Sequence, residues 1–158
     1  MRYADLFARW GLKSLRVNLK FLEAEFVLAP EDEEAAWEMY VQLLTTVLTQ
    51  RLESGHGDEK AALRSVYGLF PTTRDILTRR GRKAQSFTKI AVIILNQVIR
   101  PFTAKWHRLS LDGAFQKPEQ CQVFRLELEK LQIELRKYAA LLADLAQVED
   151  ITEIEEIS

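Results

Sequence analysis

The chain has 158 residues and a mass of 18.3 kDa, which is the size of one ordinary domain rather than two. Hydrophobic residues make up 47% and charged residues 28%, and this balance excludes wholesale disorder. The formal net charge of −1 excludes a global attraction to nucleic acid, so any electrostatic function must come from local asymmetry. The single cysteine, Cys121, excludes an internal disulfide and suits a reducing compartment, so we expect a cytoplasmic protein.

Membrane association is not expected from the pattern of apolar residues. The first ten residues carry charges at Arg2, Asp5 and Arg9 and contain no apolar run, which argues against a signal peptide. The most apolar stretch, Ile90 to Ile99, is about half as long as the roughly 20 residues that cross a bilayer.

The scarcity of turn residues predicts the fold class. The chain contains 6 glycines and 4 prolines, so it must spend its length in a few long elements. We therefore expect an all-α, single-domain bundle of five to seven helices over residues 1–148, followed by an acidic, frayed tail at 149–158.

The first predicted helix spans residues 12–26, where apolar residues recur at steps of three and four. The same stretch also alternates like a strand, but its charged neighbours are poor strand formers, and Pro30 ends it. The acidic run at 31–34 suits the start of a second helix, because carboxylates favour the positive end of the helix dipole. Two glycines predict that this helix stops within residues 54–57.

Two shorter helices are expected next. Asp58 is a suitable cap for a third helix, which Pro71 would close. Thr72 or Thr73 would then cap a short fourth helix that stops at Gly81.

The segment from Ser86 to Ile99 predicts the central and most buried helix, because apolar residues surround nearly its whole circumference. Pro101 lacks an N–H group and crowds the preceding turn, so we expect a kink or a restart at Arg100. The helix should then continue to Leu109, and Asp112–Gly113 marks a loop.

The last predicted helix covers residues 118–147 and carries an unbroken heptad stripe. At 1.5 Å per residue it would be about 45 Å long, more than a compact domain of this size needs. The stripe predicts either core burial or packing against another protein or a second copy. The residues expected to bind such a partner are Phe124, Leu128, Leu131, Leu135, Tyr138 and Leu142.

Three polar residues around Pro101 form a candidate catalytic set. Arg100 and His107 are two helical turns apart, and Asn96 lies one turn earlier, so all three share one face if the kink is mild. An Arg and a His at such spacing resemble the signature of the HEPN family of small all-helical ribonucleases. The resemblance implies metal-independent RNA cleavage at a dimer interface, in which His107 exchanges protons and Arg100 stabilises charge on the phosphate. The six intervening residues are at the upper limit of the family pattern, and the proline directly after Arg100 departs from it.

A structural interpretation of the same residues stays open. His107 could be a half-buried side chain that binds a carbonyl, and Arg100 could satisfy carbonyls at the kink or pair with a carboxylate. With only two histidines and no HExxH or paired-carboxylate spacing, the sequence predicts no metal and no cofactor.

Basic residues gather between residues 74 and 108, which hold nine bases and one acid, whereas residues 23–38 hold seven acids and no base. One interpretation is a phosphate-binding surface, which makes nucleic acid the alternative partner. The other is a solvated turn neutralised by the acidic second helix. The residues that would bind nucleic acid are Arg79, Arg80, Arg82, Lys83 and Lys105.

Four strings, at 21–26, 36–41, 95–107 and 148–152, are similar to those of a group of small all-helical bacterial proteins. The most distinctive is RPFTAKWH at 100–107. Such proteins accompany anti-phage or conflict systems, so the resemblance implies an accessory role in a bacterial defence complex. We therefore expect a non-enzymatic helical protein–protein interaction subunit or adaptor, with a HEPN-like ribonuclease and a nucleic-acid-binding accessory protein as alternatives.

Overall fold

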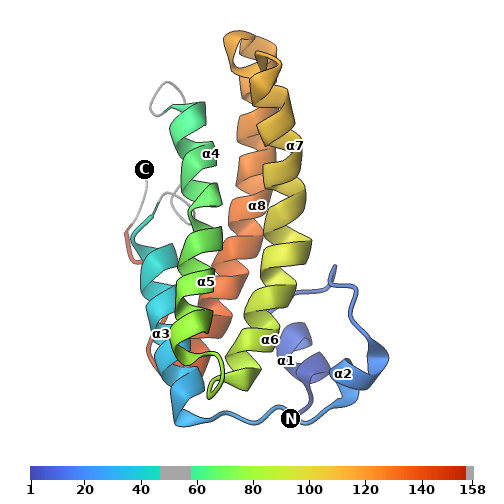
Figure 1. The fold of residues 1–158 in the computed structure, drawn as a ribbon, viewed down its shortest axis with the longest axis vertical. Coiled ribbons are helices and arrows are strands. Elements are labelled where there is room, and N and C mark those ends of the chain that lie inside the picture. The colour runs from blue at the N-terminus through green and yellow to red at the C-terminus, as the bar shows by residue number, and fades with distance from the viewer. Residues whose placement is uncertain (47–57, 156–158) are drawn as a thin grey trace.

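The computed structural model describes residues 1–46 and 58–155, and these residues form an all-α fold without strands. The structure is 74% helical, and its described part contains six helices when directly joined segments are counted together, which confirms the predicted class and the predicted range. The long helices lie side by side along the molecule, and the two short N-terminal helices pack beside one end of this bundle (Figure 1).

The helical elements follow one another in a simple order. They are α1 (Tyr3–Arg9), α2 (Leu19–Glu23), α3 (Pro30–Leu44), α4 (Glu59–Tyr67), α5 (Leu69–Arg80), α6 (Gln85–Ile94), the π-helix η1 (Leu95–Ile99), α7 (Arg100–Leu111), the 3₁₀ turn η2 (Ala114–Gln116) and α8 (Pro118–Leu145).

The prediction of one helix over residues 12–26 is wrong, because α1 and α2 flank an irregular segment there. Gly11 turns the chain after α1 with φ of 71°, a conformation that costs glycine little. Asn18 then starts α2 by accepting a hydrogen bond from the Lys20 amide at 2.8 Å. The apolar residues at the start of this pattern lie in a loop that packs on the core, since Leu12 is buried and Leu15 packs against the core.

The boundary between the third and fourth predicted helices also differs from expectation. Asp58 caps α4 as predicted, accepting from the Lys60 amide at 2.8 Å. The break falls at Gly68 rather than at Pro71, which lies in the first turn of α5. Proline is tolerated there because the N–H groups of a first turn have no partner within the helix. The predicted cap at Thr72 or Thr73 is therefore wrong, since both residues lie inside this helix.

The second predicted helix is too long, because α3 already ends at Leu44, with Thr45 as its C-cap. The predicted turn at 54–57 lies outside the described residues.

The later elements follow the sequence closely. Gly81 ends α5 as predicted, and a Cβ atom at this position would lie 2.5 Å from the Leu77 carbonyl oxygen. The helix restarts at Arg100, as expected, through the π-turn of η1. No helix among the described residues has both the length and the hydrophobicity needed to span a bilayer.

The core lies where α3, α6, α7 and α8 meet. Its largest fully buried side chains include Trp106, Tyr40 and Tyr138. The tail expected to fray is described to residue 155, and within it Thr152 is buried. Tyr40 holds this segment, because its hydroxyl donates to Asp150 at 3.0 Å and accepts from the Ile151 amide at 2.8 Å.

Candidate functional site

Arg100 and His107 lie on one face of α7, as the sequence predicts for a mild kink. The guanidinium of Arg100 stacks on the ring of Phe70, 4.9 Å from its centroid, and its Nε donates to the Asn96 side-chain oxygen at 3.2 Å. The imidazole of His107 meets the ring of Tyr67 edge-on at 5.8 Å. Since Tyr67 and Phe70 are themselves in ring contact at 6.2 Å, both α7 residues rest on one aromatic pair from the α4–α5 segment.

The π-turn explains why Pro101 does not separate these residues. Pro101 cannot donate a hydrogen bond, and η1 widens the turn before it so that the Arg100 amide bonds to the Leu95 carbonyl. The helix therefore continues past Pro101, so that Arg100 stays in contact with Asn96 and Phe70, and His107 meets Tyr67.

Few charged groups contact the face of α7 that carries Arg100 and His107. Among the described residues, no carboxylate pairs with Arg100 and none hydrogen-bonds to the imidazole of His107, which is exposed. Of the two structural alternatives for Arg100, pairing with a carboxylate is not seen within the described residues, where its side chain contacts Asn96 and Phe70 instead. An exposed imidazole and an unpaired guanidinium on one face can exchange a proton and bind an anion, respectively.

Residues 1–46 and 58–155 contain no group of three or more histidine, cysteine or acidic side chains placed to hold a metal ion. Burial raises the pKa of the Cys121 thiol, whose Sγ contacts the Phe115 carbonyl oxygen at 3.4 Å. A raised pKa lowers the fraction of thiolate, the nucleophilic form of cysteine, at neutral pH.

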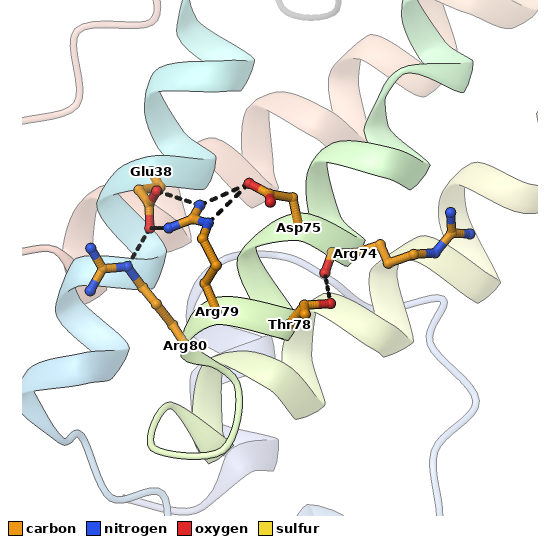
Figure 2. A network of polar contacts seen from close by, with 6 residues as sticks. All are labelled: Glu38, Arg74, Asp75, Thr78, Arg79 and Arg80. Atoms are coloured by element: carbon orange, nitrogen blue, oxygen red, sulfur yellow. Dashed lines mark hydrogen bonds and ion pairs between the residues drawn. The ribbon is translucent and has the colours of Figure 1, made fainter.

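Two arginines at the end of α5 are paired with carboxylates (Figure 2). Arg79 donates to Glu38 at 2.7 Å and to Asp75 at 2.9 Å, and Arg80 pairs with the same Glu38. Hydrogen bonds from Arg79 and then Arg80 hold the pKa of Glu38 below its ordinary value. Arg74 points away from this cluster (Figure 2).

The other residues of the predicted phosphate-binding set do not extend this cluster. Lys105 pairs with Glu127, which also accepts from the Trp106 indole at 2.5 Å. Arg82 and Lys83 are exposed at the turn. The structure therefore leaves two of the five predicted bases outside the ion pairs described above.

The predicted docking stripe on α8 faces the interior. The protein's own core buries all six side chains, with exposed fractions of 6% or less. The expectation that this stripe meets a partner is wrong for this conformation, because the neighbouring helices already cover it. Those residues are Phe124, Leu128, Leu131, Leu135, Tyr138 and Leu142.

A second apolar row on α8 faces outward instead, and the sequence reasoning missed it. Val123, Leu126 and Ile133 are exposed by 41%, 60% and 47%, and Lys130 lies exposed among them. The spacing 123, 126, 130, 133 repeats the three–four pattern of the buried stripe, so the signal was present in the sequence. The longer buried stripe of α8 was the stronger signal, so the outer row was overlooked.

A groove of about 430 Å³ borders this outer row between α7 and α8. Val98, Phe102 and Leu131 give it apolar lining, while Glu127 and Lys130 supply charge. Lys130 belongs to both the groove and the outer row, so the two surfaces adjoin.

Comparisons of this chain with protein-family models, with curated proteins and with solved structures found no match.

Proposed function

We propose that the protein is a non-enzymatic helical interaction subunit, and that it binds an amphipathic helix of another protein along the outer row of α8. The outer row is Val123, Leu126, Lys130 and Ile133. The observation that supports this proposal is the exposure of three large apolar side chains on one helix whose other stripe is already used for the core. Isolated exposed apolar residues are common, but a row at helical spacing matches the way a partner helix presents its own side chains.

The surroundings suit a partner helix with charged flanks. The aliphatic stem of Lys130 can extend the apolar strip while its ammonium group stays in water. Glu127 and Lys105, which line the adjoining groove, can exchange their mutual ion pair for contacts with charged side chains of the partner.

A matched pair of leucine variants tests the proposal. Tagged wild-type protein, Leu126→Glu and Leu111→Glu would be used as baits in lysate of the native cells, with bound proteins identified by mass spectrometry. Leu111 is the control because it is exposed by 74% near the end of α7, away from the outer row. We expect a specific partner to bind wild type and Leu111→Glu and to be lost with Leu126→Glu. Identical sets of bound proteins for all three baits would refute docking on this face.

The ribonuclease alternative is retained because Arg100 and His107 rest on the same aromatic pair and Arg100 pairs with no described carboxylate. Incubation of mixed RNA with the purified protein in EDTA tests it, using His107→Ala, Arg100→Ala and the neighbouring Arg108→Ala as control. Cleavage that disappears in the first two variants and persists in the third would support this alternative. Absence of cleavage, or cleavage unaltered in His107→Ala, would remove it.

A further inference from the structure

A second surface feature adjoins the outer row of α8, where the C-terminal segment passes close to α1, and Ile133 belongs to both surfaces. The structure contains a cleft of about 670 Å³ between them. Its fixed wall comes from the end of α1 and from α8, and its other wall comes from residues 149–154. The cleft is thus bordered by a short terminal segment that is not part of any helix.

The two walls carry opposite charge. The fixed wall lines the cleft with three cations and with Trp10, Ile133 and Ala140. The terminal wall lines it with three carboxylates and two isoleucines. The cations are Arg9, Arg136 and Lys137, and the terminal side chains are Glu149, Asp150, Glu153, Ile151 and Ile154.

The outer part of the terminal segment is held weakly. Glu153 pairs with Arg136 at 3.7 Å although the Glu153 side chain is 82% exposed, and Ile154 is 71% exposed. An ion pair that is so exposed to water contributes little to the stability of the segment. The terminal segment is anchored more firmly at residues 150–152, where Tyr40 hydrogen-bonds to Asp150 and Ile151 and where Thr152 is buried. Residues 153 and 154 are held by the exposed ion pair and by a hydrogen bond from the Ile154 amide to the Ile151 carbonyl at 3.1 Å, and breaking both leaves the Tyr40 contacts in place.

The fixed wall also holds a hydrogen-bond donor without an acceptor. Among the described residues, the indole nitrogen of Trp10 is the one buried side-chain N or O atom that lacks a partner. A buried N–H group without an acceptor destabilises the state that contains it.

We propose that the cleft between α1 and α8 binds an acidic, isoleucine-containing peptide segment of another protein, and that the chain's own residues 153–154 compete with it. Carboxylates of the peptide replace Glu153 at Arg136 and compete with Asp144 for Arg9 and with Glu134 for Lys137, while its isoleucines cover Ile133 and Ala140. The terminal segment has this same composition, which is the guide to the chemistry of the partner. The proposal rests on the proposed function as an interaction subunit and adds a second contact to it.

Fluorescence anisotropy of a labelled peptide tests the site on the full chain. The probe is the sequence of residues 148–155, VEDITEIE, and the control peptide VQNITQIQ replaces each carboxylate by an amide. The proteins are wild type, a loosened double variant with Glu153→Gln and Ile154→Ser, and that double variant carrying Arg9→Glu, Arg136→Glu or Arg108→Glu. Both loosening substitutions lie at exposed side chains, so folding is preserved. Arg108 is the control because it is exposed on α7 and does not line the cleft.

We expect the loosened variant to bind the acidic peptide at least about fivefold more tightly than wild type, because the internal competitor is weakened. Arg9→Glu and Arg136→Glu should each weaken binding about tenfold, with Arg108→Glu unchanged. No binding to the loosened variant, equal binding of the amide peptide, or equal effects of all three arginine variants would overturn the proposal. A wild-type dimer in sedimentation equilibrium that Arg9→Glu dissociates would also overturn it, because the occupant would then be a second copy.

The outcomes separate this inference from the proposed function. Leu126 does not line the cleft. If the partner is lost with Leu126→Glu but the peptide never binds, the cleft proposal is refuted and the outer-row proposal stands. If the peptide binds but Leu126→Glu captures the same proteins as wild type, the outer-row proposal is refuted and the cleft proposal stands.

Discussion

Asp32 is a buried carboxylate that joins two helices. It is 1% exposed, and its oxygens accept from the Ala29 amide at the start of α3 and from the Phe87 amide in the first turn of α6, both at 2.8 Å. Helix starts leave N–H groups unpaired, and a carboxylate there also meets the positive end of each dipole. One side chain therefore completes two helices.

We predict that Asp32→Ala lowers the free energy of unfolding by about 2–4 kcal/mol, because the buried Phe87 amide loses its acceptor. Asp32→Asn keeps an oxygen for that amide and should cost less. Chemical denaturation of both variants measures the two values. A cost for Asp32→Ala within about 0.5 kcal/mol of wild type would contradict this role.

Glu38 gives a prediction with a pH dependence. The Arg79 and Arg80 contacts lower the pKa of Glu38 from its ordinary value of 4.5. A carboxyl whose pKa is depressed by folding stabilises the protein above its unfolded pKa, and this contribution is lost as the pH falls through the folded pKa. Glu38→Gln should therefore cost about 0.5–1 kcal/mol near neutral pH, as expected for a surface ion-pair cluster.

The difference between wild type and Glu38→Gln should shrink as the pH falls below 4.5, because the wild-type carboxyl then becomes neutral as well. Thermal unfolding at neutral and acid pH measures this difference. A gap between the two proteins that stays constant or widens in acid would show that Glu38 does not act through its charge.

At the scale of the element, α8 presents two apolar rows with different roles. Leu135 is fully buried, whereas Leu126 is 60% exposed. Leu135→Ala should lower the free energy of unfolding by about 2–5 kcal/mol, because it removes buried area and leaves a cavity. Leu126→Ala should change it by less than about 0.5 kcal/mol. Parallel denaturation curves measure both, and similar costs at the two positions would contradict the assignment of the two faces.

The π-turn η1 is an element that local sequence only partly specifies. Pro101 requires an interruption, and the sequence therefore predicts a kink or a restart. The structure resolves it as a widened turn, and Gln97 within it accepts from the Arg16 amide and donates to the Arg16 carbonyl, each at 2.7 Å. That contact joins positions 81 residues apart, so no local pattern could have indicated it.

At the scale of the whole molecule, one core joins the N-terminal helices, the central helices and α8. A single core of this size should unfold in one cooperative transition. A variant with Trp106 as its sole tryptophan, made by Trp10→Phe and Trp37→Phe, would report the core by fluorescence while circular dichroism reports the helices. We expect coincident midpoints, and a fluorescence transition that precedes the loss of helix would show that the parts unfold separately.

The sequence by itself determined the helical class, the cap at Asp58, the stop at Gly81, the restart at Arg100 and the extent of the last helix. These features depend on backbone freedom and hydrogen bonding within a few residues, which local sequence encodes. The shared face of Arg100 and His107 was also predictable, because helix geometry fixes it once the helix continues.

Only the tertiary structure decided which surfaces are available. It buried the stripe of α8 that the sequence favoured for a partner, exposed the row at Val123 and Leu126, and engaged Arg79 and Arg80 with Glu38. It also replaced the single helix expected at 12–26 by an irregular segment and the short helix α2, which pack on the core. Burial and ion pairing depend on segments far away in the chain, so a periodic pattern can predict a helix without fixing which of its faces packs inward.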